Sequence, residues 1–246
     1  MKPGISPGNS RTAMLLGEDA VTRIQRSHVM ILGLGGVGSY AAEALGRMGV
    51  GRFTLVDGDT FEESNLNRQL CALTSTLGKA KVEVTRQRLL DINPTAKITA
   101  LQAFYLPESP VPITQDVDMV VDAIDTVAAK IHIAQTCAAM NIPLISCMGM
   151  GNRLDPSLIR IGDLFQTSGC ALCRVMRKEL RKRGVQQLRC VYSLEEACAS
   201  QTENPEKKGR RAVPGSVAYV PSIAGLMMAA DVIASLCKQT NSGECS

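Results

Sequence analysis

The sequence contains no tryptophan and few aromatic residues of any kind. Aromatic side chains make up 3% of the 246 residues, as four Tyr and four Phe. A surface that binds single-stranded nucleic acid by stacking needs more rings than this. The composition therefore disfavours a binding module of that class.

The sequence also lacks an uninterrupted apolar run of membrane length. The stretch 217–237 is apolar, but Pro221 and Asp231 interrupt it, which favours a buried core helix over a membrane span. The opening segment MKPGISPGNSRT has no apolar core of the kind that a secretory signal carries. We therefore expect no membrane partner and a cytoplasmic location, in which the nine Cys stay reduced.

Short β-rich runs alternate with helical runs in the first part of the chain. Strands are predicted at 28–32, 52–57, 97–102, 119–122 and 143–147, and helices at 37–48, 79–91 and 127–140. This alternation predicts an α/β fold with a Rossmann-like, mostly parallel sheet and helices on both faces.

The pattern weakens in the last third of the chain. One strand is predicted within 153–164, a basic helix at 171–183, a flexible loop at 199–216 and an apolar helix at 222–238. Residues 1–10 are expected to form a loose arm. We expect a single domain of 246 residues, with a nucleotide-binding core at about 11–150 and an irregular extension at about 151–246.

A glycine-rich loop follows the first predicted strand. In VMILGLGGVG, the glycines at 33, 35 and 38 form the pattern G-x-G-x-x-G, and Gly36 adds a further small residue. Gly33 permits a tight turn, Gly35 allows phosphate to approach the backbone, and Gly38 lets the next helix pack on the sheet. The free N–H groups of that helix end favour an anion, so the loop predicts a nucleotide site.

Two carboxylates follow the second predicted strand. Asp57 lies nineteen residues after Gly38, where an acid accepts hydrogen bonds from ribose hydroxyls. This position suits NAD and ATP equally well. Asp59 adds a second carboxylate, which NAD does not require.

A cluster of charged and amide side chains distinguishes these two nucleotides. Its members beyond the two carboxylates are Asn65, Asn67, Arg68, Lys81, Asp122 and Asp125. Adenylate transfer builds negative charge on the α-phosphate and on pyrophosphate, which cations and Mg²⁺ stabilise. Hydride transfer has little use for such groups. A carboxylate nucleophile needs no general base, and His28 and His132 are both expected to be structural.

Positive charge is concentrated in two later segments. The run RVMRKELRKR at 174–183 predicts a phosphate-backbone site formed by Arg174, Arg177, Lys178, Arg181, Lys182 and Arg183. The segment EKKGRR at 206–211 adds four more cations. A solvated helix face and a solvated loop are the alternative interpretation of these runs.

The motifs in this order resemble a known superfamily. The stretches GLGGVGS, LVDGDTFEESNLNRQ, GKAKVE and VVDAIDT resemble those of ubiquitin-activating enzymes and their bacterial ThiF/MoeB-type relatives. The later stretches SCMGMGNRLDPSLIRIGDL, RVMRKELRKRG and PGSVAYVPSIAGL resemble the family of tRNA threonylcarbamoyladenosine dehydratases. This resemblance implies adenylation of the carboxylate of a modified adenosine beside the anticodon, followed by cyclisation with loss of AMP.

The resemblance assigns roles to particular residues. It implies that Asp57 binds ribose, that Asn65 and Arg68 contact the triphosphate, that Lys81 binds phosphate and that Asp125 is associated with Mg²⁺. The alternative for Asn65 and Arg68 is a structural role in capping a loop. The alternative for Lys81 is an exposed position on a helix with no role in binding.

The resemblance also implies protein and nucleic-acid partners. Arg11 matches an arginine that reaches the phosphates of a neighbouring subunit, which implies a homodimer with Arg11 in the catalytic set. The extension at 151–246 would then bind the tRNA substrate and support the dimer. A sulfur-carrier or desulfurase-type protein is a further partner consistent with the superfamily.

Three other functions stay open at this point. An adenylyltransferase for a ubiquitin-like sulfur carrier is the main alternative, but relatives of that kind often carry two C-x-x-C pairs that bind zinc. This chain has one pair, Cys170 and Cys173, so zinc is not expected. An NAD-dependent oxidoreductase ranks well below the adenylyltransferase, because hydride transfer would leave the cluster of Arg68, Lys81 and Asp125 without a role. A binding module without catalysis conflicts with the intact Arg68, Lys81 and Asp125.

Overall fold

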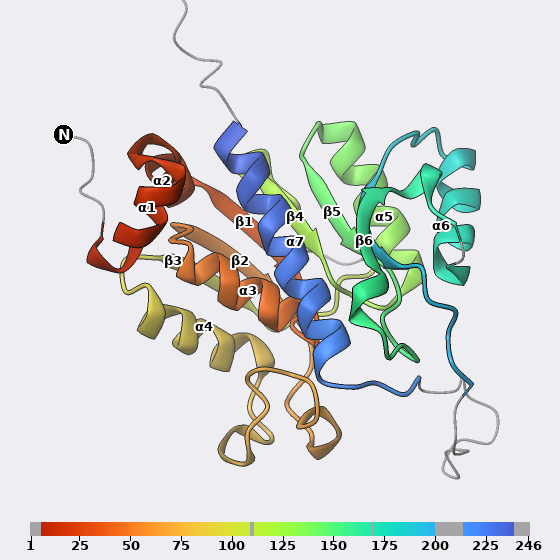
Figure 1. The fold of residues 1–246 in the computed structure, drawn as a ribbon, viewed down its shortest axis with the longest axis horizontal. Coiled ribbons are helices and arrows are strands. Elements are labelled where there is room, and N and C mark those ends of the chain that lie inside the picture. The colour runs from red at the N-terminus through yellow and green to blue at the C-terminus, as the bar shows by residue number, and fades with distance from the viewer. Residues whose placement is uncertain (1–5, 109–110, 169, 200–213, 239–246) are drawn as a thin grey trace, which may run out of the picture.

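The fold is organised around one seven-stranded sheet with the order β3-β2-β1-β4-β5-β7-β6 (Figure 1). In this computed structural model, residues 6–108, 111–168, 170–199 and 214–238 are described. All neighbouring strands pair in parallel except β6 and β7. The strands are β1 (His28–Leu32), β2 (Arg52–Val56), β3 (Lys97–Leu101), β4 (Met119–Asp122), β5 (Leu144–Cys147), β6 (Ile159–Asp163) and β7 (Arg189–Ser193).

Helices cover both faces of this sheet. The helices are α1 (Ser10–Leu16), α2 (Glu18–Arg26), α3 (Gly38–Arg47), α4 (Lys81–Ile92), α5 (Val127–Met140), α6 (Ala171–Lys182) and α7 (Tyr219–Lys238). Helix α7 packs against α2 and α3, and α4 packs beside α3 on the same face. Helix α5 contacts β4, β5 and α6 on the other face.

The burial of β1 explains why the sheet lies at the centre of the molecule. All five of its residues are buried. Val29 and Ile31 contribute to the core beneath α3 and α7, whereas Met30 and Leu32 contribute to the core beneath α5. Side chains alternate across a strand, so a continuous apolar run is the pattern expected of a strand covered on both faces.

The predicted α/β fold is confirmed, and the predicted strands end within a residue of the observed ones. Among the strands, β7 (Arg189–Ser193) was missed; it lies between β5 and β6 and extends the sheet. The prediction of a loose arm through residue 10 is wrong for its last part, because a 3₁₀ turn at Pro7–Asn9 leads directly into α1. Residues 1–5 and most of the predicted loop at 199–216 lie outside the described residues.

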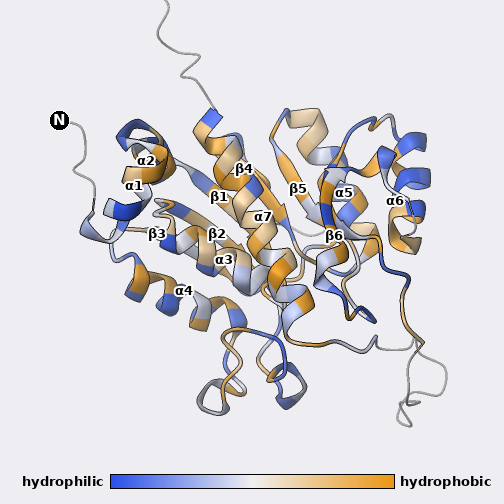
Figure 2. Cartoon of the chain, viewed as in Figure 1, coloured by the Kyte–Doolittle hydropathy of each residue, from blue (hydrophilic) through white to orange (hydrophobic). Residues whose placement is uncertain are grey.

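Helix α7 is long and apolar enough to cross a membrane, judged by length and composition alone. It contributes to the core, however, through buried side chains that include Val220, Met228 and Leu236. Figure 2 shows this apolar helix lying along the middle of the molecule. Its packing against α2 and α3 agrees with the expectation of a core helix.

Candidate nucleotide-binding site

The expected nucleotide residues gather at the carboxyl ends of β1, β2 and β4. The chain leaves β1 towards α3 on one face of the sheet and leaves β4 towards α5 on the other. Adjacent parallel strands whose connections diverge in this way leave a crevice between them, where ligands of open α/β sheets bind. The glycine loop and the turn after Asp122 border this crevice.

The glycine loop is held by close backbone contacts that exclude a side chain. Gly33 has a φ of +88°, and a Cβ added there would lie 2.9 Å from the carbonyl oxygen of Ala123. A Cβ on Gly38 would lie 1.8 Å from the carbonyl oxygen of Gly33. The backbone amides of residues 35–38 have no hydrogen-bond partner in the described part of the chain. They are available to an anion, as expected at the start of α3.

Asp57 is fixed beside this loop by two backbone donors. The amide of Leu34 donates to its Oδ2 at 2.7 Å, and the amide of Asp59 donates to its Oδ1 at 2.9 Å. Each carboxylate oxygen keeps a free lone pair. Asp57 is therefore oriented by the glycine loop and retains the capacity to accept two ribose hydroxyls.

Asp59 and Lys81 form an ion pair at the start of α4. Lys81 Nζ lies 3.0 Å from Asp59 Oδ2, and the backbone amide of Lys81 donates to the carbonyl of Asp59 at 3.0 Å. The side chain of Lys81 is 6% exposed, whereas that of Asp59 is 52% exposed. Lys81 is thus a buried cation whose partner opens to solvent, which differs from the exposed helix lysine considered above.

The segment 65–68 lies against the glycine loop. The Nη1 of Arg68 donates to the carbonyl of Ser64 at 2.7 Å and to Asn67 Oδ1 at 2.8 Å. A Cβ added to Gly36 would lie 3.4 Å from Arg68 Cγ, so the arginine stem packs beside the loop. Nε and Nη2 of Arg68 form no hydrogen bond within the described ranges and remain able to donate to phosphate.

The two asparagines of this segment form hydrogen bonds within the protein, one local and one to a distant part of the chain. Asn65 is buried, and its Oδ1 accepts from the amide of Glu62 at 3.2 Å in a reciprocal cap of a 3₁₀ turn. Asn67 donates from Nδ2 to the carbonyl of Ser216 at 3.0 Å. The second contact joins the nucleotide segment to the chain just before α7.

The two aspartates that follow β4 have different environments. Asp122 is fully buried, and its Oδ2 accepts from Lys130 Nζ at 2.8 Å and from Ser146 Oγ at 2.5 Å. Asp125 is exposed, and the hydroxyl of Thr126 donates to it at 3.5 Å. The Asp122 carboxylate is therefore occupied inside the protein, whereas the exposed Asp125 carboxylate forms no ion pair within the described residues and stays available to a cation.

Gln69 lies beside the glycine loop and was not among the residues predicted from the sequence. Its side chain is 7% exposed, and its Oε1 has no hydrogen-bond partner within the described residues. Its Nε2 lies 3.9 Å from the position of a Cβ added to Gly35. The amide of Gln69 is uncharged, so it does not stand out in the sequence as a phosphate-binding group. Its position directly after Arg68 was the one feature of the sequence that pointed to this loop.

Arg11 is not brought to this cluster within one chain. It lies on α1, which packs against α2, and its side chain is exposed. The neighbouring side chains of Met14 and Leu15 on the same helix are each 85% exposed.

The six predicted tRNA-binding cations lie on or next to α6 but are not equivalent. Arg177 donates to the carbonyl of Thr167 at 2.7 Å and also to the Thr167 hydroxyl, so it anchors the preceding turn. Arg181 lies over the ring of Phe165, 5.4 Å from its centroid. Hydrogen bonds from Arg183 and Lys182 lower the pKa of Glu179 to about 2.

Arg174 and Lys178 are the exposed cations of α6 that have no hydrogen bond, ion pair or ring contact among the described residues. Figure 2 shows that several turns of this helix are coloured as hydrophilic. The second basic segment, 206–211, lies outside the described residues.

The C-x-x-C pair, at which zinc was not expected, is buried together with Cys190. Cys170, Cys173 and Cys190 are at most 3% exposed and lie in one apolar cluster. A hydrogen bond with Cys173, together with burial, raises the pKa of Cys170, and burial raises the pKa of Cys147 to about 12. Thiols that stay protonated are poor nucleophiles, so the electrostatics favour structural roles for them.

Neither histidine lies in the nucleotide cluster. His28 is buried at the start of β1, and its Nε2 pairs with Thr54 Oγ1 at 2.9 Å. His132 lies on α5, where its Nδ1 pairs with the Tyr105 hydroxyl at 3.0 Å. Both sets of contacts agree with the structural roles expected for them.

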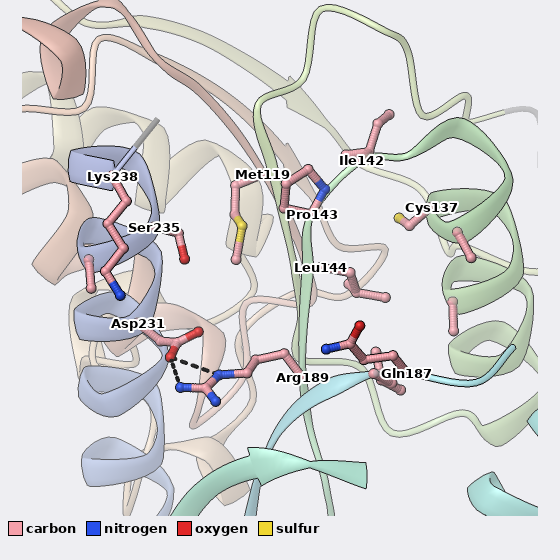
Figure 3. A pocket seen from close by; sticks show the side chains of 14 residues that line it. Met119, Cys137, Ile142, Pro143, Leu144, Gln187, Arg189, Asp231, Ser235 and Lys238 are labelled. Carbon is pink, nitrogen blue, oxygen red and sulfur yellow. Dashed lines mark hydrogen bonds and ion pairs between the residues drawn. The ribbon is translucent and has the colours of Figure 1, made fainter. Parts of the chain in front are cut away.

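A cavity of about 590 Å³ lies at the opposite edge of the sheet (Figure 3). Its walls come from the amino ends of β4, β5 and β7 and from helices α5 and α7. Arg189 spans one side and donates to Asp231 at 2.6 Å and 3.0 Å. None of the glycine-loop residues lines this cavity, so it is separate from the nucleotide cluster.

The chain belongs to the ThiF family, whose model matches residues 9–245. It is 41% identical to the tRNA threonylcarbamoyladenosine dehydratase of Bacillus subtilis, over 93% of this chain and 94% of the relative. The crystal structure of Escherichia coli tRNA N6-threonylcarbamoyladenosine dehydratase, TcdA, in complex with ATP matches with a TM-score of 0.82. That match has 31% identity and covers 95% of this chain and 97% of the other.

A second branch of the family is also similar over a shorter range. The sulfur carrier protein ThiS adenylyltransferase of Escherichia coli is 38% identical over 138 residues, which is 55% of each chain. The similarity to the dehydratases extends through most of the chain, including the part after β5.

We expect Gly35→Ala to impair nucleotide binding without impairing the fold. The added Cβ would meet nothing closer than 3.9 Å, so the unfolding temperature should stay near that of the wild type. The methyl group would occupy space that a phosphate needs, and we expect the Kd for ATP to rise by at least ~10-fold. Calorimetric titration and thermal unfolding measure the two quantities.

Gly38→Ala is the matched control for this prediction. Its Cβ would clash with the Gly33 carbonyl, so we expect it to lower both stability and ATP affinity. Native ATP affinity in Gly35→Ala would show that the phosphates do not lie on this loop.

Proposed function

We propose that this protein catalyses the ATP-dependent, cyclising dehydration of threonylcarbamoyladenosine next to the tRNA anticodon, through adenylation of its side-chain carboxylate. The observation that carries the proposal is the meeting of the glycine loop, the ribose-type acid Asp57 and the cations Arg68 and Lys81 at one strand edge. Similarity to named dehydratases along nearly the full chain supports the choice of substrate.

The site residues divide the chemistry of adenylation between them. The amides of residues 35–38 and Arg68 hold the phosphates, and Asp57 accepts the ribose hydroxyls. Lys81, held by Asp59, stabilises the charge that develops as pyrophosphate leaves. Asn65, Asn67 and Gln69 shape the loop around these groups. A carbamoyl atom then attacks the activated carbonyl, and AMP leaves with the oxygen that came from the carboxylate.

Asp125 is the residue that would hold Mg²⁺ with ATP. Magnesium binds through one or two carboxylates together with substrate phosphates, so a single exposed carboxylate at this edge fits the ion. Bound Mg²⁺ would supply charge neutralisation to the phosphates. Asp59 is less suited because Lys81 already occupies it.

The direct test is nucleoside mass spectrometry. Purified protein, ATP and Mg²⁺ are incubated with tRNA that carries threonylcarbamoyladenosine, and the digested nucleosides are analysed. We expect the wild type to remove one water from that nucleoside in an ATP-dependent reaction. Arg68→Ala should abolish this reaction, because Arg68 donates to the phosphates. Removal of a donor that stabilises developing negative charge typically lowers the reaction rate by ~100-fold or more.

An unchanged nucleoside mass, with AMP transferred to a carrier ending in Gly-Gly, would instead assign the protein to the sulfur-carrier branch. The similarity to the ThiS adenylyltransferase makes that the second candidate function. A desulfurase-type partner belongs to the same alternative.

We propose that the outer face of α6 and the segment 206–211 contact tRNA phosphates, with the reaction located in the cytoplasm. Because Arg177 is engaged inside the protein, Arg174 and Lys178 are the sharper test. We expect Arg174→Glu with Lys178→Glu to weaken tRNA binding ~10-fold or more and to flatten its salt dependence. The Kd for ATP should not change, and native tRNA affinity would contradict the assignment.

We also propose a homodimer in which Arg11 completes the site of the partner subunit. The exposed Met14 and Leu15 on the same helix support a buried position for α1 in an assembly. Arg11→Ala and Arg68→Ala should each be inactive. After mixing and subunit exchange, heterodimers should carry one intact site, which restores about a quarter of wild-type activity. Absence of recovery in exchanged dimers would contradict a role in trans.

A further inference from the structure

Arg153 is a buried arginine, and the described part of the chain offers no acceptor to two of its guanidinium nitrogens. Its side chain is 5% exposed, and its Nε and Nη1 atoms have no hydrogen-bond partner within the described residues. Taking a charge out of water is costly unless it is paired, so buried cations are normally found with a carboxylate or several carbonyl groups.

The nearby carboxylates are used elsewhere. Both oxygens of Glu195 accept the backbone amide of Leu154, at 3.0 Å and 3.1 Å, and Oε2 also accepts that of Asp155 at 3.0 Å. Oδ1 of Asp155 accepts the amide and the hydroxyl of Ser157. These contacts fix the chain around Arg153, and no carboxylate of the described residues forms an ion pair with its guanidinium.

The loop that carries Arg153 is joined to the nucleotide cluster. The preceding residue, Asn152, has a left-handed φ of 56°, and it exchanges hydrogen bonds of 2.8 Å and 2.6 Å with Gly215. The next residue, Ser216, accepts from Asn67 at 3.0 Å. Arg153 therefore belongs to the loop after β5 that borders the 65–68 segment, at the same edge of the sheet as Asp125.

We propose that Arg153 binds the carboxylate of the acid substrate and orients it for attack on the α-phosphate. This inference rests on the proposed function and adds the group that recognises the acid. A guanidinium offers two parallel N–H donors that match a carboxylate, and a preformed, buried fork loses little freedom on binding. Arg153 is 5% exposed, and a carboxylate at the end of a flexible side chain needs less room than a phosphodiester flanked by two nucleosides, so the burial of Arg153 favours the carboxylate as its ligand.

In the proposed step, one carboxylate oxygen bonds to the α-phosphorus as the bond to the bridging oxygen of pyrophosphate breaks. The electron pair of that bond leaves with pyrophosphate. Arg153 contacts the carboxylate before and during the attack and exchanges no proton with it, since a guanidinium stays protonated.

The test compares Arg153→Gln with Arg160→Gln, which removes an exposed arginine of β6 and changes the net charge equally. Binding is measured for tRNA with threonylcarbamoyladenosine, for the same tRNA with unmodified adenosine, and for ATP. For Arg153→Gln we expect affinity for the modified tRNA to fall ~10-fold or more, because charged hydrogen bonds are lost. Affinity for unmodified tRNA and for ATP should stay unchanged, and Arg160→Gln should match the wild type throughout.

Thermal unfolding without substrate separates binding from structure. Removal of an unpaired buried charge should leave the unfolding temperature of Arg153→Gln equal to or above that of the wild type. A lower unfolding temperature with unchanged discrimination between the two tRNAs would show a structural role and overturn the proposal. An equal fall in affinity for both tRNAs would show a contact to the nucleic-acid backbone and would also overturn it.

Failure of the proposed function is distinguishable from failure of this assignment. Wild-type dehydration of the modified nucleoside is measured first. If the wild type dehydrates it and Arg153→Gln does so with an unchanged KM, only the role of Arg153 is wrong. A wild type that fails to dehydrate it contradicts the proposed function itself.

Discussion

The site depends on the buried ion pair between Asp122 and Lys130. Asp122 ends β4, Lys130 lies on α5, and Ser146 of β5 donates to the same carboxylate oxygen, so one acid joins three elements. A buried pair adds little net stability, because desolvation offsets the attraction, but loss of one partner is costly. Its effect is to fix one geometry. The turn after Asp122 positions both Asp125 and the Ala123 carbonyl against which Gly33 packs.

A series of cross-links extends from this fixed point along the strand edge. The amide of Leu34 ties the glycine loop to Asp57, Asp59 is paired with Lys81, and Asn67 is tied to Ser216. Each contact joins segments that are distant in sequence. Adenylate transfer gains from donors that already face the developing charge, since no reorganisation is then needed during the reaction. In the proposed reaction, the glycine loop, Asp57 and the cations Arg68 and Lys81 would act as one preorganised surface for this reason.

The sequence predicted the sheet and the glycine loop well because their signals are local. Apolar runs such as His28–Leu32 and the glycine spacing at 33–38 reflect backbone demands that few other residues meet. Strand β7 was missed because RCVYS is short and begins with an exposed arginine, and its burial arises from β5 and β6 on either side. The role of Arg177 was equally hidden, since its acceptors at Thr167 lie ten residues earlier in the chain.

The cations of this protein show why charge in a sequence does not identify a binding surface by itself. Arg177 is partly buried and Lys81 is buried. The acceptors of Arg177 lie inside the protein, whereas Lys81 is paired with the half-exposed Asp59. Arg153 is as buried as Lys81 and has no acceptor within the described residues. Within the described residues, Nη1 of the first arginine has backbone and hydroxyl acceptors, whereas Nε and Nη1 of the second have none. An unpaired buried cation is costly, and in the proposed reaction the carboxylate of the substrate is the anion that offsets this cost, at the edge of the sheet where the carboxylate is activated.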